Sequence, residues 1–390
     1  MMRFEMSHFE FATAARIVFG WGEARQLAAA AAQMGRRALV VTGSSPERAR
    51  PLIANLESAG VACAPFSTPS EPTIDLIRAG AEYARAEGCG MVIAIGGGSA
   101  IDAGKALAAL LTNTGEPLDY LEVIGRGQPL RHPSAPLIAV PTTAGSGAEV
   151  TRNAVLASPA HRVKASLRSP FLLPKCALVD PELTLNLPRA ITAATGLDAM
   201  TQVIEPYVSS RANAMTDLYC VDGLRRAAAA LPRVWEDGQD RDARTAMSWV
   251  SLLGGMALAN AGLGAVHAFA ASVGGMWKAP HGAICAAVLP HAIEVNVEAL
   301  RRRAPRNPAL RRYDEIARLL TRQPHAIADD AVLWIANLCD RLEIPPLRAY
   351  GVTEADIPDL AENAARTSSM KGNPIELTAE ELCEIALRAL

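Results

Sequence analysis

The sequence has no excess of one charge and no basic tract. Its 390 residues include 38 lysines and arginines against 40 aspartates and glutamates, a net charge of −2. Nucleic acids and anionic membrane surfaces are recognised largely through concentrated positive charge. We therefore expect neither as a partner.

Paired cysteines are also missing. Seven cysteines are scattered along the chain without a C-x-x-C pair, a pattern typical of buried thiols in a reducing compartment rather than of a disulfide framework. The first residues, MMRFEMSHFEF, carry charge and lack the apolar core and cleavage site of a secretory signal. Both features predict a cytoplasmic protein.

Charged residues are absent between Thr245 and Trp277. This stretch is long enough to span a bilayer, but Asn260, His267 and six glycines interrupt it. Because glycine pairs divide it into shorter helices, we predict a buried core of a soluble protein rather than a membrane span.

The first half of the chain alternates between strand and helix signals. Apolar strands are predicted at 37–42, 91–95 and 137–140, each leading into a loop of small residues, with helices between them. This alternation is typical of a parallel α/β sheet, in which ligands bind at the carboxyl ends of the strands.

The second half changes character. Residues 179–184 are interpreted as the last extended segment, and helical patterns dominate after Pro188. A chain of this length favours two domains. We predict a Rossmann-like α/β nucleotide-binding domain over residues 1–187 and an all-α domain over 188–390.

A glycine-rich loop follows the second predicted strand. Residues 96–105, GGGSAIDAGK, leave a strand and open a helix, where backbone amides and the helix dipole favour a phosphate group. The loop matches neither the G-x-G-x-x-G fingerprint nor a P-loop. The residues alone leave two interpretations open, a pyrophosphate site and a tight strand-to-helix turn.

Four positions in the helical half suggest a metal site. Asp198 and Gln202 are four residues apart, so a helix presents both on one face. His267 and His281 lie in apolar, glycine-rich stretches, where an unsatisfied imidazole would be costly. One carboxylate and two imidazoles suit a divalent metal. Alternatively, the histidines are satisfied core residues and Asp198 caps a helix.

Six motifs occur in order along nearly the whole chain. Together they resemble the iron-containing (group III) alcohol dehydrogenases, which share the dehydroquinate synthase-like fold. The resemblance implies an NAD(P)-binding domain and a helical metal-binding domain, with cofactor and metal meeting in the cleft between them, and a homodimer. The motifs are residues 19–22, 96–102, 141–149, 196–205, 262–267 and 279–282.

The resemblance also implies roles for individual residues. Those matching nucleotide-contacting positions are Gly97, Gly98 and Ser99 in the pyrophosphate loop, Asp102 beside it, Thr142 and Thr143 in a second loop, and Lys164 and Leu178 on the nicotinamide side. Those matching metal ligands are Asp198, His267 and His281, which are also the predicted catalytic residues.

The chain departs from this pattern in the metal site. Many relatives carry histidine where this chain has Gln202 and Ala271. A glutamine oxygen coordinates hard cations, but holds a borderline one less strongly than imidazole does. We keep Gln202 in the predicted ligand set, with Fe(II), Zn(II) and Mn(II) as the candidate metals. Ala271 leaves the general base unassigned.

A further departure concerns the cofactor. Many NAD-preferring relatives have aspartate after the first strand, where this chain reads Thr42-Gly43-Ser44-Ser45. A carboxylate there binds the ribose hydroxyls and repels a 2′-phosphate. With Gly43 and Ser44 as cofactor contacts and Arg48 nearby, we hypothesise that NADP(H) is accepted, or even preferred to NAD(H).

These features predict an NAD(P)-dependent oxidoreductase that interconverts an alcohol and an aldehyde or ketone by metal-assisted hydride transfer. One alternative is a metal-independent reductase of the maleylacetate reductase type, which Gln202 and Ala271 favour. Another is a non-catalytic nucleotide-binding protein. The substrate itself is not identified by the sequence.

Overall fold

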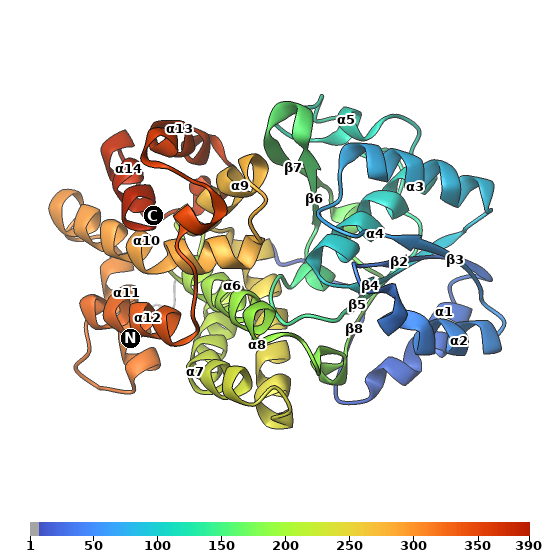
Figure 1. Cartoon of the computed structure of the whole chain (residues 1–390), viewed down its shortest axis with the longest axis horizontal. Helices are drawn as coiled ribbons and strands as arrows, with labels where there is room; N and C mark the ends of the chain where they lie inside the picture. Colours follow the sequence, from blue (N-terminus) through green and yellow to red (C-terminus); the bar gives the residue numbers. More distant parts are fainter. Residues whose placement is uncertain (1–7) are drawn as a thin grey trace. The chain divides into compact units, whose positions relative to one another are not determined.

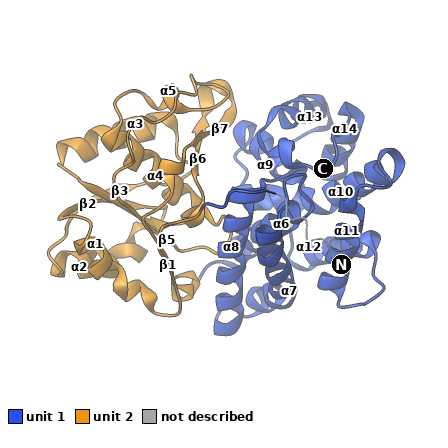
Figure 2. Cartoon of the chain, turned by 180° about the vertical axis from the view of Figure 1, so that it is seen from behind, with its two compact units in different colours: residues 1–12, 187–390 blue, residues 13–186 orange. Residues whose placement is uncertain are grey.

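The computed structural model describes residues 8–390, which form two compact units. Unit 2 covers Thr13–Asn186, and unit 1 covers Leu187–Leu390 together with the N-terminal segment up to Ala12 (Figure 2). The division after residue 186 lies next to the predicted domain boundary. The N-terminal segment groups with the helical unit because, for example, the backbone of Ala12 exchanges hydrogen bonds of 2.7 and 2.9 Å with the Asn260 side chain.

Unit 2 contains the predicted parallel sheet (Figure 1). Its strand order is β1-β8-β5-β4-β2-β3, and every described pairing in it is parallel. The α/β fold class is thus confirmed. The strands are β1 (Ile17–Phe19), β2 (Arg37–Thr42), β3 (Ala62–Ser67), β4 (Met91–Gly96), β5 (Leu137–Pro141) and β8 (Cys176–Val179).

The central strands are apolar throughout because both faces of the sheet are covered. In β2, Leu39 and Val41 belong to one core cluster, whereas Ala38 and Val40 belong to another. Alternate side chains therefore pack against helices on opposite faces. The helices of this unit are α1 (Leu27–Ala32), α2 (Arg50–Ser58), α3 (Ile74–Ala86), α4 (Gly98–Thr112) and α5 (Pro117–Tyr120).

Two details of unit 2 differ from the sequence interpretation. The extended segment predicted at 179–184 ends at Val179, and Pro181–Thr184 form a 3-10 turn. Pro181 cannot donate to a strand ladder, and the Asp180 carboxylate caps the turn by accepting the Glu182 amide at 2.9 Å. In addition, β6 (Asn153–Ser158) and β7 (Val163–Arg168) form an antiparallel hairpin that the sequence did not reveal.

Unit 1 is helical, as predicted (Figure 1). The charge-free stretch is divided between α8 (Arg241–Ala261) and α9 (Ala265–Met276), whose axes bend by 98°, and the apolar window of α10 (His281–Arg303) is 78% buried within the protein. By length and composition, α10 is the one described helix that could cross a membrane. If the bent pair is counted as a single span, there are two such segments. The helices are α6 (Arg189–Val208), α7 (Ala214–Glu236), α8 (Arg241–Ala261), α9 (Ala265–Met276), α10 (His281–Arg303), α11 (Pro308–Thr321), α12 (Ala328–Arg341), α13 (Ile357–Arg366) and α14 (Ala379–Arg388).

Helix α6 lies at the centre of unit 1, and glycines let its neighbours approach closely. A Cβ atom on Gly254 of α8 would lie 2.9 Å from the Cβ of Gln202, and one on Gly282 of α10 would lie 2.5 Å from the carbonyl oxygen of Ala194. Real Cβ atoms do not approach other atoms so closely, so these positions favour glycine. The glycines fix how near the first turn of α10 comes to α6.

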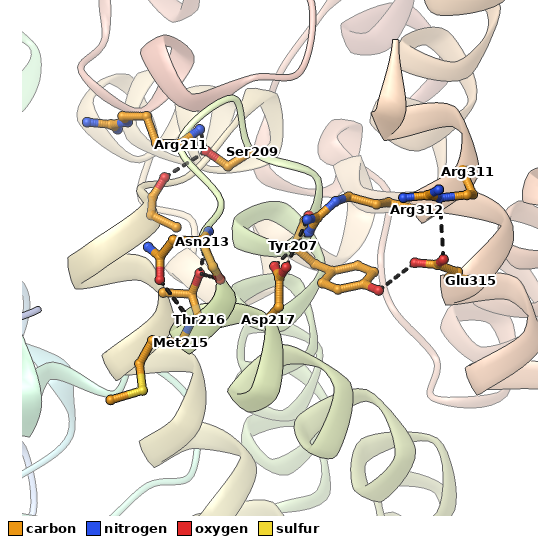
Figure 3. Close-up of polar contacts among 11 residues, drawn as sticks. Tyr207, Ser209, Arg211, Asn213, Met215, Thr216, Asp217, Arg311, Arg312 and Glu315 are labelled. Atoms are coloured by element: carbon orange, nitrogen blue, oxygen red, sulfur yellow. Dashed lines mark hydrogen bonds and ion pairs between the residues drawn. The ribbon is translucent and has the colours of Figure 1, made fainter. Parts of the chain in front are cut away.

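A polar network holds the carboxyl end of α6 (Figure 3). Arg312 of α11 donates to both carboxylate oxygens of Asp217 at 2.6 and 2.8 Å and to the Tyr207 carbonyl at 2.7 Å. The Tyr207 hydroxyl donates to Glu315 at 2.6 Å. Because bidentate arginine pairs are geometrically specific, this network ties α6 to α7 and α11.

A buried charged cluster holds α4 in unit 2. Lys105, fully buried, donates to the Thr151 hydroxyl at 2.7 Å and to the Asn153 carbonyl at 2.8 Å, and lies 3.7 Å from Asp102. Burial raises the pKa of Asp102 to about 6 and that of nearby Glu149 to about 7, while the charge of Lys105 opposes both shifts. The lysine thus links the helix after the glycine loop to the chain after β5.

Replacing Lys105 with methionine should destabilise the protein in a pH-dependent way. At pH 8 we expect a loss of about 3–5 kcal/mol in unfolding free energy, because two buried carboxylates lose their cation. The pKa values of both carboxyls are higher in the folded than in the unfolded protein. The free energy of unfolding therefore falls as the pH rises from the unfolded-state pKa values to the folded-state pKa values. The loss should therefore be smaller at pH 5, where both carboxyls bind protons. Urea titrations at both pH values measure it, with exposed Lys175→Met as control, and equal losses would contradict this account.

Candidate active site

The predicted nucleotide loops converge at the carboxyl edge of the sheet in unit 2. Helix α4 begins at Gly98, directly after β4, with Gly97 as its N-cap. A Cβ on Gly97 would lie 3.3 Å from the Thr143 hydroxyl oxygen, and one on Gly98 would lie 2.8 Å from that of Ser146. The loop after β4 therefore packs directly against the loop after β5. The amides of the first turn of α4 lie at the edge where a phosphate would bind.

The loop after β2 joins this edge. A Cβ on Gly96 would lie 3.3 Å from the backbone nitrogen of Gly43. Ser44, which follows Gly43, is exposed, and Thr142 donates its backbone amide to the Gly96 carbonyl at 2.9 Å. Three of the predicted cofactor segments thus meet, as expected for parallel strands.

The other predicted cofactor residues have protein partners. The Asp102 carboxylate accepts the Val155 amide at 3.1 Å, and Lys164 pairs with Glu71 at 3.0 Å. Leu178 is fully buried in β8, within the core of the sheet. Arg48 donates to two carbonyl groups, those of Leu183 and Leu185, at 2.8 and 3.2 Å. Cofactor contact by any of these residues stays a prediction.

The predicted metal ligands come together in unit 1. Asp198 and Gln202 lie on α6, His267 in the first turn of α9, and His281 at the start of α10. The Asp198 Oδ1 atom is 3.3 Å from His267 Nε2 and 3.9 Å from His281 Nε2. Residues from three different helices thus present one oxygen and two nitrogens to the same small volume.

Glu205, one turn beyond Gln202 on α6, sets the orientation of His267. Its Oε2 atom lies 2.7 Å from His267 Nδ1, and its Oε1 accepts the Val266 backbone amide at 2.7 Å. A Cβ on Gly264 would lie 3.0 Å from that Oε1, so glycine makes room for the carboxylate at the start of α9. The Nδ1–H bond leaves Nε2 of His267 directed at Asp198. This carboxylate–histidine arrangement is typical of metal sites.

Three buried polar atoms in this cluster have no hydrogen-bond partner among residues 8–390. They are Asp198 Oδ1, Gln202 Oε1 and His267 Nε2. Orphaned buried groups cost free energy and are rare in folded proteins. A divalent cation would satisfy the carboxylate and imidazole atoms together, and their chemistry suits such an ion. The residues present therefore fit a metal.

The electrostatics of the cluster favour positive charge. Burial by itself would lower the pKa of His267, but Glu205 and Asp198 outweigh it and raise that pKa to about 10. For Asp198, burial is likewise outweighed, by His267, His281 and Gln202, so its pKa falls below the ordinary value. The two buried carboxylates thus require positive charge nearby, which either a protonated imidazole or a divalent metal can supply.

Family comparisons agree with this arrangement. The model described as iron-containing alcohol dehydrogenase matches residues 14–181, and that of the C-terminal region of the Fe-containing alcohol dehydrogenase family matches residues 192–390. The chain belongs to the iron-containing alcohol dehydrogenase family. The sequence resemblance is confirmed, and the protein is an enzyme of the alcohol dehydrogenase type.

Individual relatives match between 80% and 98% of this chain. It is 38% identical over 320 residues to 4-hydroxybutyrate dehydrogenase of Cupriavidus necator, covering 80% of this chain and 81% of that protein. It is 33% identical over 390 residues to NAD-dependent methanol dehydrogenase of Bacillus methanolicus, covering 96% and 97%. The crystal structure of a 1,3-propanediol oxidoreductase superposes with a TM-score of 0.91 at 32% identity, covering 98% of this chain and all of that one.

Two members of the site of this alcohol dehydrogenase were not assigned to it from the sequence. Glu205, the last residue of the motif at 196–205, was given no part in the site, and its contact with His267 depends on the approach of α9 to α6. Cys285 was grouped with the buried thiols, but it forms a cluster with Asp198, His267 and His281 in which the ligand atoms all lie within 4.8 Å of one another. Its spacing of four residues from His281 was the available signal.

Glu205→Gln should weaken metal binding by this alcohol dehydrogenase by about 10–100-fold, the usual effect of removing a carboxylate behind a histidine ligand. Glutamine has the size of glutamate, but its neutral amide oxygen accepts the Nδ1–H of His267 more weakly than the charged carboxylate does. Titration of the zinc-loaded protein with a competing chelator measures the change, with exposed Glu362→Gln as control. Unchanged zinc affinity would show that Glu205 serves only to pack the helices.

Proposed function

We propose that this member of the family is a metal-dependent NAD(P)(H) alcohol dehydrogenase or aldehyde reductase. A divalent cation, Fe(II) or Zn(II), would be held by Asp198, His267 and His281. The observation that supports this most is that Asp198 Oδ1 and His267 Nε2 lie 3.3 Å apart in a buried site, and neither atom has a hydrogen-bond partner among residues 8–390. A merely structural histidine would have both ring nitrogens satisfied.

The chain's own residues hold and orient the reacting groups in this proposal. When bound, the cation supplies Lewis-acid polarisation of the substrate oxygen, and the nicotinamide accepts or donates hydride. Glu205 fixes the tautomer of His267, so that its free nitrogen is the one aimed at Asp198. The side chain of His281 is 35% exposed, whereas those of Asp198 and His267 are almost fully buried. Substrate would therefore approach from the His281 side.

The nucleotide is proposed to bind unit 2. Gly97, Gly98 and Ser99 would hold the pyrophosphate at the amino end of α4, where free backbone amides and the helix dipole favour an anion. Thr142 and Thr143, in the adjoining loop, would contact the same cofactor. The name of the Bacillus methanolicus relative includes NAD dependence, which supports a nicotinamide cofactor.

We further propose that the enzyme is a cytoplasmic homodimer that acts on small alcohols or carbonyl compounds. None of its seven cysteines, all within residues 8–390, forms a disulfide. Such a chain needs no oxidising compartment.

Metal dependence is tested by stripping and reloading the purified enzyme. Turnover would be followed with NAD(H) and NADP(H) across alcohols, aldehydes and keto acids, before and after chelation. We expect activity to be lost on chelation and restored by Fe(II), Zn(II) or Mn(II), because the buried carboxylates need the cation. Full activity in protein shown by elemental analysis to be metal-free would overturn the proposal and favour the maleylacetate reductase type of reaction. Cofactor binding without any turnover would favour a non-catalytic protein.

We propose that the enzyme accepts NADP(H). A substitution at Gly43 tests this choice of cofactor. A Cβ there has open space, with no other atom within 4 Å, so Gly43→Asp is compatible with the fold. The new carboxylate should lower kcat/KM for NADP(H) relative to NAD(H) by about tenfold or more, since like charges about 4 Å apart repel by about 1–4 kcal/mol. Gly43→Asn, without the charge, is the matched control. A wild-type enzyme that strongly prefers NAD(H) would contradict the hypothesis.

A further inference from the structure

A buried thiol completes the candidate metal cluster. Cys285 lies on α10 one turn after His281, so both side chains leave the same face of the helix. Its Sγ atom is 3.7 Å from His281 Nε2, and the residue is fully buried. The close contact of Gly282 with the Ala194 backbone brings this turn of α10 against α6.

Three of the six separations among the four ligand atoms are close to those expected around a single tetrahedral ion. Metal–ligand distances of about 2.0–2.3 Å place neighbouring ligand atoms about 3.3–3.6 Å apart. The separations of 3.3, 3.7 and 3.9 Å, all involving Asp198 or His281, come within a few tenths of an ångström of this range. All the atoms, including Cys285 Sγ, lie within 4.8 Å of one another.

Gln202 is less suited to be the fourth ligand. A Cβ on Gly254 would lie 3.5 Å from Gln202 Oε1, so this oxygen lies close to α8. Gln202 lies one turn after Asp198 on α6, so the two side chains are neighbours on one face of the helix. A neutral amide oxygen is a hard ligand, whereas a thiolate is soft and is preferred by zinc.

We propose that Cys285 is the fourth protein ligand of the metal site, together with Asp198, His267 and His281. Gln202 is then a positioning residue for Asp198. The inference rests on the proposed metal dependence and specifies it. A thiol that binds a metal gives up its proton, and a Cys-His-His-Asp set favours Zn(II) over Mg(II) or Mn(II). Zinc sites can expand to five ligands during a reaction, so a fourth protein ligand does not exclude substrate.

The direct test is X-ray absorption of the zinc-loaded wild-type enzyme. We expect one sulfur at about 2.3 Å beside nitrogen and oxygen ligands at about 2.0–2.1 Å. Bound zinc with nitrogen and oxygen ligands alone would overturn the role of Cys285 and leave metal dependence intact. Failure to bind zinc at all would overturn both proposals. Because no substitution is needed, the result does not depend on how a variant folds.

Cobalt substitution gives an independent readout. Co(II)-loaded wild-type protein should show a strong near-ultraviolet sulfur-to-metal charge-transfer band, which Cys285→Ala should abolish. The same variant should lower zinc affinity by at least about tenfold, through loss of the soft ligand. Cys220→Ala removes another fully buried thiol of unit 1, from α7, and should change neither property. A band that persists in Cys285→Ala would overturn the proposal, and circular dichroism melting would check that both variants are folded.

Discussion

The candidate site depends on how closely other helices approach α6. Asp198, Gln202 and Glu205 all lie on this helix, where Asp198 lies close to residues of α9 and α10, Gln202 lies close to α8, and Glu205 contacts α9. Gly254 of α8, Gly264 before α9 and Gly282 of α10 remove the side chains that would keep these neighbours away. The ligand cluster is therefore a consequence of helix packing. A methyl group on any of these three glycines would meet an atom at 3.0 Å or less, a distance that a packed core does not allow without movement.

Close packing brings charge into the interior, and the charge must be compensated there. Asp198 and Glu205 are both almost fully buried on one face of α6, and His267 lies between them. An isolated buried carboxylate would be very costly. Glu205 is compensated by His267 and by the Val266 amide, whereas Oδ1 of Asp198 has no hydrogen-bond partner among the described residues. Glu205 is therefore the carboxylate that orients a ligand, and Asp198 is the carboxylate suited to bind a cation.

Much of this organisation could be predicted from the sequence, and the missing parts share a cause. The strands at 37–42, 91–95 and 137–140 were predicted because apolar runs followed by small-residue loops are local signals. The β6–β7 hairpin was missed because it lies outside the parallel alternation, although its strands bury alternate residues, such as Ala154 and Leu156. The contact between Glu205 and His267 joins positions 62 residues apart, which no local pattern reports.

Cys285 illustrates the same limit. Its spacing from His281 was visible, but the same spacing occurs on any helix face. Only the approach of α10 to α6 brings the thiol within ligand distance of Asp198. Helices α6, α9 and α10 each contribute at least one ligand, so a bound cation would cross-link three elements. Binding energy at such a site is also folding energy. Glutamine at position 202 leaves this cross-link intact, because Asp198 already anchors α6.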